Sequence, residues 1–175
     1  YLWEEVWLRD SWLEILGRYL IAQRNDKKQL TSVIFPRYHQ LAATRQMVAD
    51  VLANGPGQRY LIQHSAGSGK TNSIAWTAHF LADLHDADNI KLFDSVMVVS
   101  DRNVLDAQLR DAIFDFQRTT GVVATITDDH GSKSAQLSQA LNDGKKIIVC
   151  TIQTFPFALK AVQELSATEG KRFAV

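Results

Sequence analysis

The sequence contains a single cysteine, Cys150, among its 175 residues. One cysteine excludes an internal disulfide and a zinc site built from cysteines, and it agrees with a reducing compartment. The sequence also lacks an apolar run of the roughly 18 residues that a membrane-spanning helix needs. We therefore expect a cytoplasmic protein that is neither stabilised by disulfides nor inserted in a membrane.

The chain has no excess of either charge, because 19 Lys and Arg residues offset 19 Asp and Glu residues. A protein without net charge has no overall basic surface for nucleic acid, so any contact with DNA must be local. Apolar residues make up 46% of the chain and charged residues 22%, values typical of folded globular proteins. The length suits one ordinary domain with a short additional segment.

The first 23 residues favour an amphipathic helix, since apolar residues recur at three- and four-residue steps. Three of the four tryptophans lie in this segment, so we expect the helix to dock on another surface. The polar run at residues 25–29 predicts a connector. We therefore divide the chain into a connector helix and linker, residues 1–30, and a main domain, residues 31–175.

Helical and extended patterns alternate in the main domain. Helices are expected at 38–54 and near 70–85, 102–118, 133–142 and 153–165. Short β-type runs are found at 59–63, 95–100, 122–127 and 146–151, with a last one at 172–175. Strands that alternate with helices predict an α/β fold with a mostly parallel sheet covered by helices on both faces.

The sequence HSAGSGKT, residues 64–71, lies between the first expected strand and the helix that follows it. It matches the phosphate-binding pattern G-x-x-x-x-G-K-[ST] except that His64 replaces the first glycine. Glycines let the backbone N–H groups turn toward an anion, and the following helix N-terminus adds partial positive charge. The alternative is a glycine turn that only caps a helix and leaves Lys70 in solvent. The nucleotide hypothesis assigns phosphate binding to Ser65, Ala66, Gly67, Ser68, Gly69, Lys70 and Thr71.

Four motifs between residues 35 and 155 together resemble those of the first RecA-like motor domain of superfamily 2 helicases. They are more similar still to the motor (R) subunit of type I restriction-modification enzymes. The first motif, FPRYHQ at 35–40, resembles the arginine-x-x-glutamine adenine motif, which implies that Gln40 binds adenine. The second is the phosphate loop. The resemblance implies ATP and Mg²⁺ as cofactors, with Lys70 and Thr71 as catalytic residues and Thr71 as a metal ligand.

The third motif, SDRNVLDAQL at 100–109, is similar to the D-R-x-x-L-D-x-Q signature of the type I motor subunits. The resemblance implies that this segment contacts one DNA strand, through Arg102, Asn103 and Gln108. A loop and helix N-terminus after a parallel strand also offer N–H donors to phosphate. The alternative is a helix cap at Asp101 followed by ordinary surface charges.

The fourth motif, CTIQTF at 150–155, resembles the T-x-x-x-F string of the same family. The resemblance implies that Thr151 and Gln153 contact the DNA backbone. Phe155 is expected in the core.

This resemblance implies an ATP-dependent translocase that moves double-stranded DNA before cleavage, in a complex with specificity and methyltransferase subunits. The family's Asp-Glu-Ala-His box does not occur before Val175, and the sequence opens on Tyr1. We therefore expect the first motor domain of a longer protein, cut before that box and inactive alone. The alternatives are another superfamily 2 motor, of the type III restriction or remodeller kind, a P-loop kinase or switch, and a nucleotide-binding module without catalysis.

Overall fold

A four-stranded parallel sheet organises the chain from residue 95 onward. Its strands are β3 (Ser95–Ser100), β4 (Val123–Thr125), β5 (Ile147–Thr151) and β6 (Phe173–Ala174). They lie in the order β4-β5-β3-β6, and every neighbouring pair is parallel. The α/β fold with a parallel sheet is therefore confirmed, and four of the five expected strands are present with ends shifted by at most two residues.

The computed structural model describes residues 2–175 except 26, 28, 102, 117–120 and 127–131. It also leaves out the side chains of 24, 103–108, 134, 167 and 168. In the part of the chain that it describes, no helix has the length and apolar character needed to cross a bilayer.

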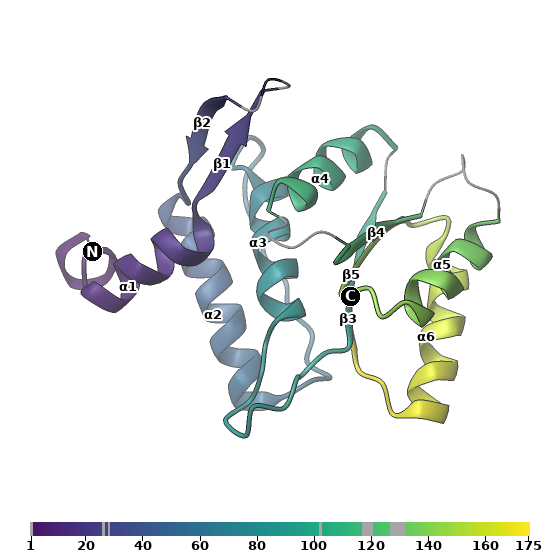
Figure 1. The fold of residues 1–175 in the computed structure, drawn as a ribbon. Coiled ribbons are helices and arrows are strands. Elements are labelled where there is room, and N and C mark those ends of the chain that lie inside the picture. Colours follow the sequence, from purple (N-terminus) through teal and green to yellow (C-terminus); the bar gives the residue numbers. More distant parts are fainter. Residues whose placement is uncertain (1, 26, 28, 102, 117–120, 127–131) are drawn as a thin grey trace.

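Helices cover both faces of the sheet, as Figure 1 shows. One face carries α3 (Lys70–Ala82) and α4 (Asn103–Asp115), and the other carries α5 (Lys133–Asn142) and α6 (Phe155–Glu169). Because side chains alternate along a strand, β3 and β5 contribute to both cores. Val98 and Val149 belong to the core cluster of α3 and α4, whereas Ile148 belongs to that of α5 and α6. A strand buried on both faces explains the continuous apolar sequences SVMVV and IIVC.

The expected strand at 59–63 is not formed, which corrects the sequence prediction. Residues 58–65 have no regular secondary structure, and the side chain of Leu61 is 91% exposed. A cavity of about 730 Å³ lies between this segment, α3 and the strands β3 and β6. A β-type sequence needs a neighbouring strand to accept and donate its backbone hydrogen bonds. Among the described residues no strand lies alongside this segment.

The single N-terminal helix expected over residues 1–23 is not confirmed. The structure has a π-helical turn η1 (Leu2–Val6), the short helix α1 (Arg9–Glu14) and a second π-helical turn η2 (Ile15–Tyr19). An antiparallel hairpin of β1 (Ile21–Arg24) and β2 (Leu30–Ile34) follows, so the expected connector at 25–29 joins two strands. Most of the apolar stripe faces solvent, because only Val6, Ile15 and Tyr19 are buried in these helical turns.

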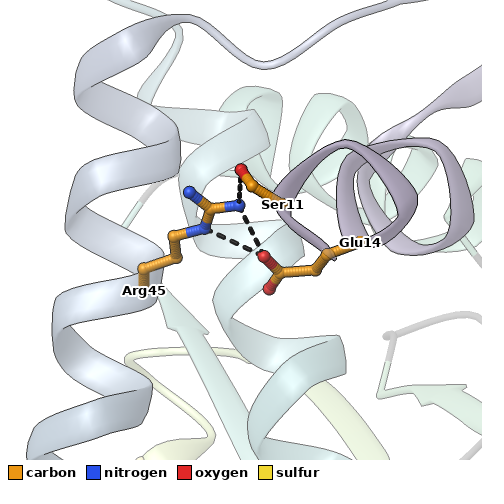
Figure 2. Close-up of polar contacts among 3 residues, drawn as sticks. All are labelled: Ser11, Glu14 and Arg45. Atoms are coloured by element: carbon orange, nitrogen blue, oxygen red, sulfur yellow. Dashed lines mark hydrogen bonds and ion pairs between the residues drawn. The ribbon is translucent and has the colours of Figure 1, made fainter. Parts of the chain in front are cut away.

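The N-terminal segment nevertheless packs closely on α3 and on α2 (Tyr38–Asn54). The Tyr19 ring lies 5.7 Å from the ring of Trp76, whose indole N–H donates to the Tyr19 carbonyl over 3.0 Å. Arg45 of α2 forms an ion pair with Glu14 at 2.6 Å and donates to the Ser11 hydroxyl at 2.7 Å (Figure 2). These contacts attach residues 11–19 to the two helices that flank the phosphate loop.

The Tyr19 hydroxyl is buried beside this ion pair. Burial, together with the nearby Glu14 carboxylate, raises the pKa of Tyr19 far above its usual range. The phenol therefore stays neutral at every physiological pH and contributes through its ring.

We predict that Arg45→Met lowers the free energy of unfolding by about 2 kcal/mol, because it removes charge-assisted hydrogen bonds and leaves the half-buried Glu14 carboxylate without its cation. Urea denaturation measures the loss. Arg110→Met is the control, since its ion pair with Asp111 is longer, at 3.7 Å, and more exposed, and its loss should change the same quantity by less than about 0.5 kcal/mol. An equal loss of unfolding free energy in the two variants would show that the ion pair of Arg45 and Glu14 does not hold residues 11–19 on α2.

Candidate nucleotide-binding site

The phosphate loop, residues 64–69, leads directly into α3 at Lys70. Gly67 and Gly69 have φ angles of 74° and 81°, in the left-handed region that glycine adopts at little cost. At Gly69 a side chain is also excluded by space, because a Cβ atom there would lie 2.6 Å from Nε2 of Gln40. The loop conformation and its contact with α2 therefore both require glycine at position 69.

Three side chains hold the carbonyl groups of the loop. His39 and Gln40, at the start of α2, donate to the carbonyls of Ser68 and Gly69, each over 2.9 Å. Lys70 donates from Nζ to the carbonyls of Ser65, at 2.9 Å, and His64, at 3.2 Å. The carbonyl groups of residues 64, 65, 68 and 69 are thus each held by a side chain. These hydrogen bonds restrict the directions that the N–H groups between them can take.

Gln40 joins the adenine motif to the phosphate loop. Its side chain is only 3% exposed, and its Oε1 accepts a hydrogen bond of 2.8 Å from the backbone N–H of Arg37. The Nε2 group donates to the loop, so both ends of the amide are engaged within the protein. The structure brings together two motifs that lie about 30 residues apart, while the binding of adenine by Gln40 stays a prediction.

Three polar atoms in the loop and in the first turns of α3 are buried. His64 Nδ1, Ser68 Oγ and Ser73 Oγ are buried without a hydrogen-bond partner among the described residues. Buried polar groups in folded proteins are rarely left unpaired, and a ligand is one explanation for those that are. These atoms lie close in sequence to Lys70 and to the N-terminus of α3, where phosphate-binding loops place their donors, and the binding of ATP phosphates by this region stays a prediction.

Thr71 lies in the first turn of α3, half-buried, where a hydroxyl can serve as a Mg²⁺ ligand next to a bound phosphate. The described residues contain no group of three or more His, Cys, Asp or Glu side chains arranged around a metal.

The two segments expected to contact DNA meet at the carboxyl edge of the sheet. β3 and β5 pair in register up to Ser100 and Thr151, and the N–H of Ile152 donates to the Ser100 carbonyl over 2.8 Å. Gln153 is exposed, whereas Thr151 is buried with its hydroxyl 3.2 Å from that of Thr154. Arg102 and the side chains of Asn103 and Gln108 lie outside the described residues, so their contacts with DNA stay predictions.

Sequence reasoning missed the role of His39 at this site. It lies next to Gln40 in the adenine motif, and that position was the only signal available. Its contact with Ser68 spans 29 positions of the chain and depends on how α2 packs beside α3. No local pattern encodes such a contact.

The geometry of the loop, its helix and the parallel sheet agrees with the comparison with known families. The family model described as SWI2/SNF2 ATPase matches residues 39–173, well over half of the chain. No curated protein and no solved structure matches at a significant level. The family match includes the phosphate loop and both segments at the carboxyl edge of the sheet. The chain therefore belongs to the SWI2/SNF2 ATPase family.

Proposed function

We propose that this domain is the ATP-binding part of a DNA translocase of type I restriction systems. Membership of the SWI2/SNF2 ATPase family supports the coarser statement, an ATP-dependent motor of the superfamily 2 helicase kind. The observation that carries the nucleotide assignment is the phosphate loop, with its carbonyls held by His39, Gln40 and Lys70 at the N-terminus of α3. The type I assignment rests on the sequence of the string DRNVLDAQL at 101–109.

Phosphoryl transfer depends on positioning and on stabilisation of negative charge. The loop N–H groups and the N-terminus of α3 would bind phosphate oxygens, which keeps the triphosphate in one orientation. Lys70 is exposed, and in the part of the chain that the structure describes its Nζ donates to two loop carbonyls, so the ammonium group could exchange them for phosphate oxygens. Mg²⁺, when bound through Thr71, supplies charge neutralisation between the phosphates.

A remodeller-type motor is the second candidate, and the family match itself favours it. Both candidates bind ATP with the same loop and both act on double-stranded DNA. They differ in their partners: a type I motor acts with specificity and methyltransferase subunits, whereas a remodeller acts on DNA-bound proteins.

We predict that Lys70→Ala in the full-length protein reduces ATP hydrolysis by a factor of about 100 or more, because it removes the cation that we assign to the outer phosphates. A steady-state phosphate-release assay measures the effect. Lys160→Ala, at an exposed position on α6, should retain the wild-type rate. Persistence of DNA-dependent ATP hydrolysis in the Lys70 variant would overturn the assignment of the loop.

We predict that Gln153→Ala raises the DNA concentration needed for half-maximal ATPase stimulation about threefold, as expected for one lost hydrogen bond to a phosphate. The ATPase rate without DNA should not change. Gln163→Ala, an exposed glutamine of α6, is the matched control. A reduced rate without DNA would point to a role in folding or nucleotide binding instead.

The type I assignment is tested by measuring DNA-stimulated ATP hydrolysis with and without the specificity and methyltransferase subunits of a type I system from the same organism. A type I motor should require these subunits and a DNA recognition site. Stimulation by any duplex DNA in their absence would favour the remodeller candidate.

A further inference from the structure

Two histidine rings meet where α2 approaches the phosphate loop. His39 lies in α2 next to Gln40, and His64 is the first residue of the loop, where the usual pattern has glycine. Their ring centroids are 4.8 Å apart with an interplanar angle of 86°. We infer that His39 is a positioning residue of the phosphate loop, and that His64 is the surface against which its imidazole is held. This inference rests on the proposed function, ATP binding by the loop.

The hydrogen bond from His39 fixes one point of the loop. Its Nε2 lies 2.9 Å from the carbonyl oxygen of Ser68, and a carbonyl only accepts, so Nε2 carries the proton. Gln40 donates to the next carbonyl, that of Gly69. Two adjacent side chains of one helix therefore hold two adjacent peptide groups of the loop, directly before the first turn of α3.

The ring of His64 can contact His39, which the glycine of the usual pattern could not do because it has no side chain. An edge-to-face contact favours one relative orientation of two rings and disfavours others. The Tyr38 ring also makes an edge-to-face contact with His39, at 5.3 Å, so the imidazole is bounded by aromatic rings from α2 and from the loop. With its plane fixed in this way, His39 directs its N–H at Ser68 and not at solvent.

A phosphate loop that is already held in one conformation before ATP binds should have a higher affinity for ATP. A flexible loop must lose conformational freedom when it binds an anion. Each residue whose backbone is already fixed reduces that loss. His39 therefore acts on the affinity for ATP through its hydrogen bond to the loop.

Two substitutions at His39 separate the hydrogen bond from the ring contact. His39→Phe keeps an aromatic edge against His64 but has no donor for Ser68, whereas His39→Gln provides an amide donor without the ring. In the full-length protein, His39→Phe should weaken ATP binding about three- to tenfold, the range for one lost hydrogen bond. His39→Gln should restore binding to within about twofold of wild type. For ATP hydrolysis, we expect the change in KM to exceed the change in kcat.

A readout without nucleotide distinguishes positioning from general destabilisation. Amide hydrogen exchange of residues 65–70 should accelerate in His39→Phe, while exchange in β3 and β5 stays at the wild-type rate. His85→Phe is the matched control, because it removes a histidine whose ring nitrogen also contacts a carbonyl, that of Asp83, away from the loop. It should alter neither ATP affinity nor exchange in the loop.

The role of His64 is tested by a double-mutant cycle. If His64 holds the imidazole of His39, the effect of His39→Phe on ATP affinity should be smaller in the His64→Gly background. Strictly additive effects of the two substitutions on ATP affinity would overturn the role of His64.

Wild-type ATP affinity and wild-type loop exchange in His39→Phe would overturn the positioning role of His39, provided that wild-type protein binds ATP and Lys70→Ala does not. Failure of the wild-type protein itself to bind ATP would instead overturn the proposed function.

Discussion

The hydrogen bonds that α2 donates to the phosphate loop are the contacts on which the candidate site depends. His39 and Gln40 hold the carbonyls of Ser68 and Gly69 directly before α3 begins. The close approach of Gln40 also explains why position 69 must be glycine. The loop itself lacks regular secondary structure, so its shape depends on these side chains more than on any backbone ladder. The position of α2 therefore determines the geometry that a triphosphate would meet.

The N-terminal segment packs on α2 and so helps to fix the position of that helix. Arg45 lies further along the helix that carries His39 and Gln40, and it is paired with Glu14 at 2.6 Å. Tyr19 packs on Trp76 and Phe80 of α3, the helix that begins at Lys70. Residues 11–19 thus contact both helices that flank the loop. The ion pair is only partly exposed, about 30% for each side chain, so solvent screens it less than a fully exposed pair.

The sequence allowed the parallel sheet and most of its helices to be predicted, because buried strands such as 95–100 and 147–151 have continuous apolar runs and the phosphate loop has a fixed pattern. It failed at 59–63, where a β-type sequence has no neighbouring strand among the described residues. It also failed for the helix expected over residues 1–23, where most of the apolar residues are exposed and the hairpin begins at Ile21. Both failures concern residues whose structure depends on distant partners. The contact of His39 with Ser68 has the same character, as it joins two segments only after α2 and α3 have packed.

The unpaired segment at 59–63 has a mechanical consequence. Because this segment makes no ladder with β3 or β6, the phosphate loop is attached to α2 and α3, whereas the segments after β3 and β5 are attached to the sheet. The two candidate sites thus belong to different layers of the domain, joined through the packing of α3 on β3 and β5. A small sliding of α3 over the sheet would change the distance between them. The packing of α3 on β3 and β5, which belongs to neither site, therefore sets the spacing between the phosphate loop and the carboxyl edge of the sheet.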